Sequence, residues 1–382
     1  MTDNCRVTKT SDPIILPTSL KAHIGTAIAA AGGWLGFDRF MELALYAPGW
    51  GYYANGSPKF GLMPAGAAGG GSDFVTAPEI SPYFGRALAT QVGQALQATS
   101  TTEVWEFGAG SGALAEQLIE SLGAAVSSYN IVDLSGSLRQ QQQLRLKPFG
   151  GKVRWLSALP ARMRGVVVGN EVLDAMPVKL LVRLGGCWHE HGVVIHDDTF
   201  VWADQATTCR PPVEVPGQHD YLTEIHPQAE GFVRTLADRL EAGAVFLLDY
   251  GFPEHEYYHP QRCMGTLMCH RNHRADTDPL VDVGLKDITA HVNFTGIAVA
   301  GQDAGLQVLG YTGQGRFLLN CGLLQGLENA SIAERAMVQK LVNEHEMGEL
   351  FKVIGFAVDK PGNPYSGWQA TGFLQGDRCH TL

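Results

Sequence analysis

A glycine-spaced turn at residues 104–114 holds the first side chains whose spacing suggests chemistry. Apolar residues lead into Glu106, and Gly108, Gly110 and Gly112 then stand on alternate positions before a helix predicted over 113–122. Glycines let the backbone turn sharply and let a ligand approach, and the amides at a helix N-terminus face that ligand. The acid precedes the glycines, and the third glycine comes too early for the G-x-G-x-x-G pattern. This order suits a ligand with a cationic amino acid part and a ribose better than a ligand with a pyrophosphate. A turn that serves packing alone is the other interpretation.

A second acid ends the next predicted strand. Residues 129–134 are apolar apart from Asn130 and Asp133, and Asp133 closes the run. Its distance from the glycine turn suits a carboxylate that accepts hydrogen bonds from ribose hydroxyls. A carboxylate at the end of a buried strand is costly unless it has partners. The two motifs together therefore predict a nucleoside site, with an ordinary loop acid as the alternative.

Two further carboxylates follow the fourth predicted strand. The run 169–177 carries Glu171 and Asp174. Ligands of open α/β sheets gather at the carboxyl ends of the strands, so these acids are expected beside the first two motifs. Two carboxylates about one helical turn apart can share a face and grip a guanidinium through paired hydrogen bonds. Acids that favour the dipole of a helix N-terminus are the alternative.

The elements that must position these residues alternate between strand and helix. This alternation predicts an α/β fold with a parallel, doubly wound sheet. Five apolar strands are expected at 103–107, 129–133, 153–156, 165–169 and 244–249. After them come a helix at 290–303, a strand at 307–311, helices at 315–325 and 329–346, and a last strand at 350–358.

Additions surround this sheet on both sides. Residues 1–17 are expected to be disordered, and 18–98 to form a helical cap region with helices at 19–31, 37–46 and 83–96 and a Gly/Ala loop at 61–72. Residues 99–382 then form the main domain. Period-two alternation within 178–222 predicts a β-hairpin insertion, whereas a second insertion, 252–290, is polar, rich in histidine and irregular.

Composition narrows the function classes. The 382 residues carry a net charge of −10, so there is no basic excess for non-specific binding to nucleic acid or acidic membranes. No apolar run reaches the roughly 20 residues that span a bilayer. Met1 to Pro17 lack the features of a signal or transit peptide, and seven scattered cysteines fit reduced thiols. The sequence predicts a cytoplasmic protein with no nucleic-acid partner and no membrane insertion.

Two patterns resemble metal sites. His255 to His259 fit the H-E-x-x-H pattern of zinc proteases, but Pro253 and Pro260 leave little room for the helix that this site needs. A structural zinc set is the other candidate, formed by Cys263, Cys269, His270 and His273. Scattered thiols and loop histidines are the favoured interpretation, and no metal is predicted. His291 is interpreted as a structural histidine, with a role beside the acceptor as the alternative.

Seven blocks in order resemble one known family. The first lies at 40–46 together with 51–53, and the others lie at 73–81, 106–112, 170–177, 249–252, 287–294 and 347–353. On these blocks the sequence resembles the MidA-like family of S-adenosylmethionine-dependent methyltransferases, relatives of the mitochondrial complex I assembly protein arginine methyltransferase. The resemblance covers nearly the whole chain from about residue 35. It implies a class I methyltransferase fold, Rossmann-like and seven-stranded, with a helical N-terminal cap and β-rich insertions.

The resemblance also implies roles for single residues. Glu106 would meet the methionine amino group of the cofactor, and Asp133 would hold the ribose. The remaining cofactor-binding positions are expected at Gly108, Gly110, Gly112, Leu134, Ser157 and Asn170. Glu171 is expected to orient the acceptor and balance its charge, with Asp174 and Glu79 in support.

The implied activity is methyl transfer to a protein acceptor, with arginine favoured, and the implied acceptor is a subunit of a respiratory complex under assembly. Two alternatives stay open. One is a binding or assembly factor that keeps the cofactor fold without turnover, and the other is a small-molecule methyltransferase. The sequence does not indicate an oligomeric state.

Overall fold

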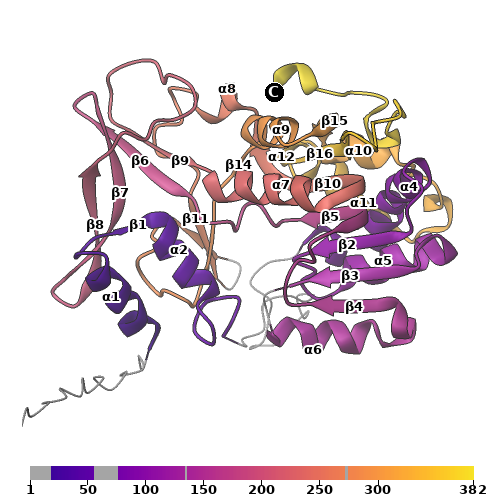
Figure 1. Cartoon of the computed structure of the whole chain (residues 1–382), viewed down its shortest axis with the longest axis horizontal. Helices are drawn as coiled ribbons and strands as arrows, with labels where there is room; N and C mark the ends of the chain where they lie inside the picture. The colour runs from indigo at the N-terminus through magenta and orange to yellow at the C-terminus, as the bar shows by residue number, and fades with distance from the viewer. Residues whose placement is uncertain (1–18, 56–75, 134–135, 272–273) are drawn as a thin grey trace, which may run out of the picture.

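The computed structural model describes residues 19–55, 76–133, 136–271 and 274–382 (Figure 1). Four expectations from the sequence fall outside these ranges: disorder at 1–17, the Gly/Ala loop at 61–72, Leu134 as a cofactor contact, and His273 as a member of the candidate zinc set. Within the described part of the chain, no helix combines the length and the apolar character that crossing a membrane requires.

A central sheet of eight strands organises the fold. Its order is β15-β16-β10-β5-β2-β3-β4, with the short β14 beside β10. Five pairings (β10–β5, β5–β2, β2–β3, β3–β4 and β10–β14) are parallel, and β16 runs antiparallel to both of its neighbours. Apart from β14, this is the predicted seven-stranded sheet. The bounds are β2 Glu103–Phe107, β3 Ser128–Val132, β4 Val153–Leu156, β5 Met163–Asn170, β10 Leu240–Phe252, β14 Val292–Asn293, β15 Leu306–Gly313 and β16 Phe351–Val358.

Apolar helices cover both faces of this sheet, which explains its uninterrupted valine and leucine strands. In β5 the three consecutive residues Val166, Val167 and Val168 are fully buried, and they point to alternate faces. One face packs against α4 (Pro82–Ala98), α5 (Ala113–Leu122), α10 (Gln314–Asn320) and α11 (Ile332–Val342). The other face packs against α7 (Pro227–Arg239) and α9 (Phe294–Asp303). The chain therefore forms a three-layer α/β fold, as the alternation predicts.

A second body stands beside the carboxyl ends of these strands (Figure 1). Helices α1 (Leu20–Ala30) and α2 (Phe37–Tyr46) share one core with a five-stranded antiparallel sheet and with parts of a three-stranded sheet. The five strands are β1 Leu35–Gly36, β6 Lys179–Leu184, β7 Cys187–His196, β8 Thr199–Ala206 and β9 Tyr221–Ile225. The three strands are β11 Met268–Arg271, β12 Arg274–Asp276 and β13 Asp287–Thr289. The N-terminal helices and both insertions thus form a single unit.

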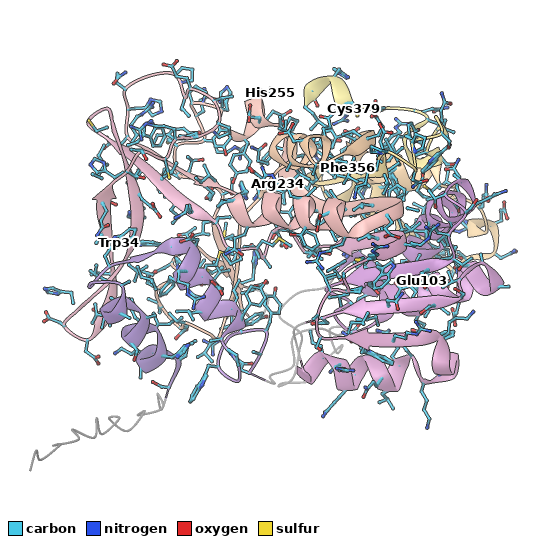
Figure 2. The ribbon with its side chains drawn as sticks, viewed as in Figure 1. Trp34, Glu103, Arg234, His255, Phe356 and Cys379 are labelled. Carbon is cyan, nitrogen blue, oxygen red and sulfur yellow. The ribbon has the colours of Figure 1, made fainter. Side chains whose placement is uncertain are left out.

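Contacts between the N-terminal segment and the two insertions hold this second body together. The short β1 pairs antiparallel with β7, and the Trp34 indole donates a hydrogen bond to the Ala203 carbonyl at 2.8 Å. Figure 2 shows Trp34 in this second body, well apart from Glu103 at the start of β2 in the central sheet. Phe37 and Phe40 pack with Cys269 and Ile288 of the second insertion.

Several boundaries differ from the prediction. The region 18–98 is not one cap, because α3 (Ala77–Ile80) and α4 pack on the central sheet while α1 and α2 join the insertions. The segment 252–290 is not wholly irregular, since it contributes the three-stranded sheet and α8 (Glu254–Tyr257). Residues 329–346 divide between α11 and the approach to α12 (Met347–Leu350). The β-hairpin predicted within 178–222 is confirmed as β6, β7 and β8.

The remaining elements are short or peripheral. Helix α6 (Gly136–Arg145) follows β3, and single 3-10 turns lie at Gly123–Ala125, Lys147–Lys152, Leu327–Asn329, Thr371–Phe373 and Cys379–Thr381.

Candidate active site

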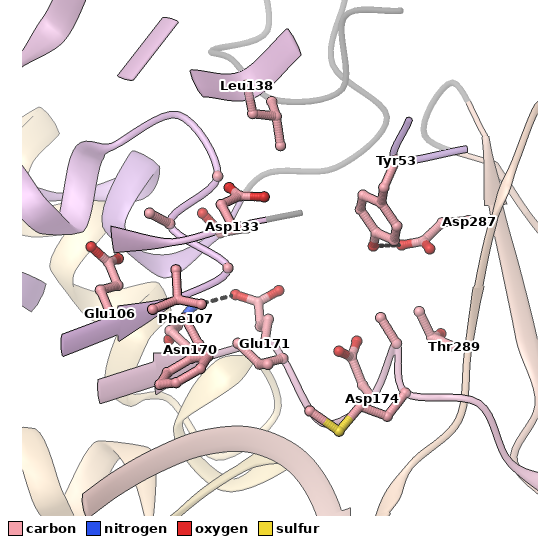
Figure 3. Close-up of a pocket in the computed structure, with 18 of the residues that line it drawn as sticks. Tyr53, Glu106, Phe107, Asp133, Leu138, Asn170, Glu171, Asp174, Asp287 and Thr289 are labelled. Atoms are coloured by element: carbon pink, nitrogen blue, oxygen red, sulfur yellow. Dashed lines mark hydrogen bonds between the residues drawn. The ribbon is translucent and has the colours of Figure 1, made fainter. Parts of the chain in front are cut away.

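A cavity of about 970 Å³ lies between the carboxyl ends of the parallel strands and the second body (Figure 3). Its walls come from the glycine turn after β2, the ends of β3, β4 and β5, and from α2, β11 and β13 opposite. Pockets for small molecules span roughly 300 to 1,000 Å³, so this volume is at the upper end. It leaves room for a nucleoside and for part of a second ligand.

The glycine turn forms one wall. Gly108 and Gly110 have φ of 62° and 52°, a left-handed conformation that favours glycine. A Cβ atom on Gly108 would lie 3.1 Å from Val172 Cγ2. Gly108 and Gly110 both line the cavity. Gly112 (φ 83°) precedes α5 outside the cavity wall, and a Cβ atom there would lie against Gln142. The cofactor contacts of all three glycines stay predictions.

Gln142 joins the first two motifs and was missed in the sequence. Its side chain is fully buried, and its Nε2 donates to the Gly110 carbonyl at 3.0 Å and to Asp133 Oδ2 at 2.8 Å. Its Oε1 accepts from Trp155 Nε1 at 3.0 Å. The residue stands in a run of four glutamines, in which nothing in the pattern distinguishes the buried one.

Glu106 is buried beside the turn. It is 2% exposed, and the Tyr129 hydroxyl donates to its Oε2 at 2.8 Å. Burial, together with the nearby charge of Asp133, raises the pKa of Glu106 to about 8, although the hydrogen bond from Tyr129 opposes this rise. A cationic group placed here would favour the ionised carboxylate. Ser157, one of the expected cofactor-binding positions, is exposed just after β4 and lines the same cavity.

Residues 171–176 form a turn rather than a helix, so Glu171 and Asp174 do not share a helix face as expected. Asp249 at the end of β10 holds this turn. Its Oδ2 accepts from the backbone amides of Val172, Leu173 and Asp174 at 3.1, 2.8 and 3.2 Å. Glu171 itself has φ of 54°, a conformation that costs free energy in residues other than glycine. The fold thus holds the Glu171 backbone in a strained conformation at the point where the Glu171 carboxylate enters the cavity.

The Glu171 carboxylate is held from two sides. Asn170 Nδ2 donates to its Oε1 at 2.9 Å, and the backbone of Ala77 in α3 also hydrogen-bonds to it. Burial, followed by the charge of Asp174, raises the pKa of Glu171 to about 8. Figure 3 shows Glu171 pointing into the open space between Asp133 and Asp287.

Asp174 lies deeper at the same wall. The Tyr250 hydroxyl donates to its Oδ2 at 2.5 Å, and burial raises the pKa of Asp174 to about 6. Within the described residues, Asp174 Oδ1 and Asn170 Oδ1 are buried acceptors without a hydrogen-bond donor. Because buried acceptors are rarely left unpaired, both atoms fit a ligand that brings N–H or O–H groups.

Glu79 occupies a different place from the other predicted catalytic residues. Its carboxylate accepts from Arg145 Nη1 at 2.9 Å and from the Ser111 hydroxyl, and Arg145 Nε donates to Glu116 at 2.8 Å. Glu79 is not part of the cavity wall, although Thr76 beside it is. The geometry therefore gives Glu79 a place behind the glycine turn, where it ties α3 to that turn.

The wall opposite Glu171 comes from residues that sequence reasoning did not assign. The Tyr53 hydroxyl donates to Asp287 Oδ2 at 2.9 Å, and the Tyr46 hydroxyl donates to the Ala175 carbonyl at 2.9 Å. The two tyrosine rings stack at 5.5 Å. Asp287, Tyr46 and Tyr53 all belong to blocks that carried the family resemblance, and this was the available signal. Its pairing with Tyr53, 234 positions away, has no local signature.

The candidate metal residues have other surroundings. Helix α8 has four residues, and His255 and Glu256 are exposed on it, so the pattern of a zinc protease is not formed. Among the described residues, no group of three or more His, Cys, Asp or Glu side chains is placed to hold a metal ion, and His273 lies outside them. His291 lines the cavity and stacks on Phe252 at 5.2 Å, and burial lowers its pKa to about 4.

The charges at the cavity wall have one sign. Of the described residues that line it, six are acids and none is lysine or arginine. The six are Glu42, Glu106, Asp133, Glu171, Asp174 and Asp287. The raised pKa values of Glu106 and Glu171 follow from this crowding and from burial. Cationic ligands would favour the ionised carboxylates and so lower the pKa values of both residues.

Comparisons with known proteins agree with this geometry. The family model described as "Putative S-adenosyl-L-methionine-dependent methyltransferase" matches residues 85–312, well over half of the chain. The chain belongs to this family. Its S-adenosylmethionine cofactor and the predicted class I methyltransferase fold are therefore confirmed, and so is the resemblance on which both were expected.

Solved and curated relatives of this methyltransferase give further detail. A crystal structure described as a "likely methyl transferase" from Burkholderia thailandensis, bound to S-adenosyl-homocysteine, is 47% identical. It superposes with a TM-score of 0.88 over 97% of this chain and 100% of that chain. The protein arginine methyltransferase NDUFAF7, mitochondrial, of Danio rerio is 26% identical over 87% of this chain and 86% of its own length. The Caenorhabditis elegans homologue is 24% identical over 86% and 81%.

Proposed function

We propose that this methyltransferase transfers a methyl group from S-adenosylmethionine to an arginine guanidinium of a protein. The observation that carries the proposal is the cavity wall, where six described acids surround the space and no described lysine or arginine balances them. A sulfonium nucleoside and a guanidinium are both cations, so this wall suits both partners. The printed names of the curated relatives support arginine as the acceptor.

The cofactor end of the cavity is proposed at β2 and β3. Glu106 would receive the amino group of the methionine part, Asp133 the ribose hydroxyls, and Gly108 and Gly110 would let the nucleoside approach the backbone. Asn170 and Ser157 complete this end. S-adenosylmethionine supplies a methyl group that is already electrophilic on its sulfonium. The work left to the chain is to align the acceptor and to exclude water.

Glu171 is proposed to orient the acceptor. A guanidinium has a pKa above about 12, so it enters as a cation and must lose a proton as its nitrogen is methylated. A carboxylate whose pKa lies near the working pH is a suitable base. Glu171 (pKa about 8) and Asp174 (pKa about 6) both meet that condition. Tyr250 fixes Asp174 so that it supports Glu171 in charge and position.

The acceptor protein and its compartment belong to the same proposal. The family resemblance suggests a respiratory-complex subunit as the first acceptor to test. A cytoplasmic location stays a prediction, because the curated relatives are named mitochondrial. The acidic net charge disfavours nucleic acid as a partner.

A small-molecule acceptor and a binding factor without turnover are the competing functions. One experiment separates them: incubation of the enzyme with methyl-labelled S-adenosylmethionine and cell extract, followed by mass spectrometry of the labelled species. We expect methylarginine in one or a few proteins, and about a hundredfold less label with Glu171→Gln. Labelled metabolite or lipid without labelled protein would overturn the protein acceptor. Binding of the cofactor without any label would favour the binding factor.

A further inference from the structure

A second cavity, of about 390 Å³, lies in the insertion between β6 and the segment 210–218. None of its lining residues belongs to the wall of the large cavity. Its innermost charged residue is Arg183 on β6, which is 5% exposed. All residues around this cavity belong to the part of the chain that the structure describes.

The Arg183 guanidinium is fixed but incompletely paired. Its Nε donates to the His219 carbonyl at 3.1 Å and its Nη1 to the Val215 carbonyl at 2.7 Å. The guanidinium carbon lies 5.4 Å from the Trp188 ring centroid and 5.7 Å from that of Tyr221. Its Nη2 is buried and has no partner among the described residues. A buried cation with an unused donor lacks the anion that normally accompanies it.

A second guanidinium lines the same cavity. Arg210 donates only to the Thr207 and Cys209 carbonyls of its own loop, at 2.9 and 2.6 Å. Across residues 136–271, no Asp or Glu forms an ion pair with Arg183 or Arg210. The cavity also contains one carboxylate, Glu214, so its formal charge is +1.

We propose that this cavity binds a carboxylate, with Arg183 and Arg210 as its ligands. The planar fork of a guanidinium matches a carboxylate, and a single negative charge neutralises the site, whereas a phosphate dianion would leave it negative. Trp188, Pro211 and Pro212 at the wall offer apolar contact to the carbon chain that carries the group. The carboxylate could belong to a free organic acid or to an acidic side chain of a bound protein.

The test uses two probes, propionate and a blocked peptide with a single glutamate, and compares that peptide with its glutamine version. Binding to the full-length enzyme is followed on the Trp188 indole signal by NMR. We expect Arg183→Lys to weaken binding at least tenfold and Arg210→Gln to weaken it less. Glu214→Gln should tighten binding severalfold, because it removes the competing carboxylate. Circular dichroism and the affinity for S-adenosyl-homocysteine, unchanged in each variant, serve as controls.

The binding results distinguish the two sources of the carboxylate. Binding of both propionate and the glutamate peptide assigns the site to an acidic side chain, and binding of propionate alone assigns it to a free acid. Equal affinity of wild type and Arg183→Lys, or weaker binding by Glu214→Gln, would overturn the proposal. If Arg183→Lys does not fold, the opposite effects of Arg210→Gln and Glu214→Gln still test it.

Discussion

At the scale of single residues, a change at Glu171 should reduce methyl transfer and leave cofactor binding nearly unchanged. Glu171→Gln keeps the shape and the left-handed backbone but removes the charge that would orient a guanidinium. We expect methyl transfer to fall about a hundredfold or more, since that is the usual contribution of a positioned acid or base. Affinity for S-adenosyl-homocysteine, measured by calorimetry, should change less than threefold. Glu241→Gln, a matched change at an ion pair with Arg162, should change neither quantity. Lost cofactor affinity in Glu171→Gln would instead place the residue at the cofactor.

The strained backbone at Glu171 predicts a conflict between stability and activity. Glycine adopts φ of 54° without the penalty that other residues carry. Glu171→Gly should therefore raise the free energy of unfolding by about 1 kcal/mol while abolishing transfer. Glu171→Ala removes the same carboxyl and keeps the strain, so the difference between the two variants in urea denaturation isolates the backbone. Equal stability of the two would show that the residue is unstrained.

The raised pKa values predict how activity depends on pH. Asp174, with a pKa of about 6, and Glu171, with a pKa of about 8, are protonated at low pH and cannot then bind a cation well. Hence kcat/KM, which reports the free enzyme, should rise from pH 6 to pH 8 at constant ionic strength. Glu171→Gln should lose the upper part of this rise and keep the part near pH 6. A flat profile in the wild type would contradict the assignment.

At the scale of elements, Glu79 acts through α3. It ties this short helix to Ser111 in the glycine turn through Arg145, and the helix backbone in turn contacts Glu171. Glu79→Gln should weaken S-adenosyl-homocysteine binding about tenfold, a change of about 1.4 kcal/mol. Its kcat should fall less than threefold. Glu116→Gln, which removes the other carboxylate on Arg145, should have a smaller effect. A loss of kcat with unchanged binding would restore the catalytic role expected from the sequence.

Local patterns predict elements well and their partners poorly. The helices Phe37–Tyr46 and Ala113–Leu122 were predicted to the residue. Their apolar periodicity and the glycines that precede them are both visible in residues that lie close together in the sequence. The pairing of Leu35–Gly36 with β7 was missed, since a two-residue strand has no period. The same limit applies to the site. Glu106, Asp133 and Glu171 follow strands and were found, whereas Tyr46, Tyr53 and Gln142 reach the site from helices and loops whose spacing shows nothing.

At the scale of the whole molecule, the buried acids couple stability to pH and to the cofactor. Glu106 and Glu171 have pKa values of about 8 in the folded state against a usual value of 4.5. The folded protein therefore holds protons that the unfolded chain has released, and stability falls as pH rises toward 8. His226 has the opposite effect, because burial lowers its pKa to about 3, but its contribution is complete above pH 6.5.

The window from pH 6.5 to pH 8 thus isolates the acids. We expect the Tm of the ligand-free enzyme, measured by calorimetry at constant ionic strength, to fall across it. Saturating S-adenosylmethionine should raise Tm more at pH 8 than at pH 6.5, because a bound cation favours the ionised carboxylates and binding stabilises the folded state. The double variant Glu106→Gln, Glu171→Gln should have a nearly flat Tm over the same range. If the wild type is equally flat, the pKa values of Glu106 and Glu171 are not raised in the folded enzyme, and these carboxyls do not couple stability to pH.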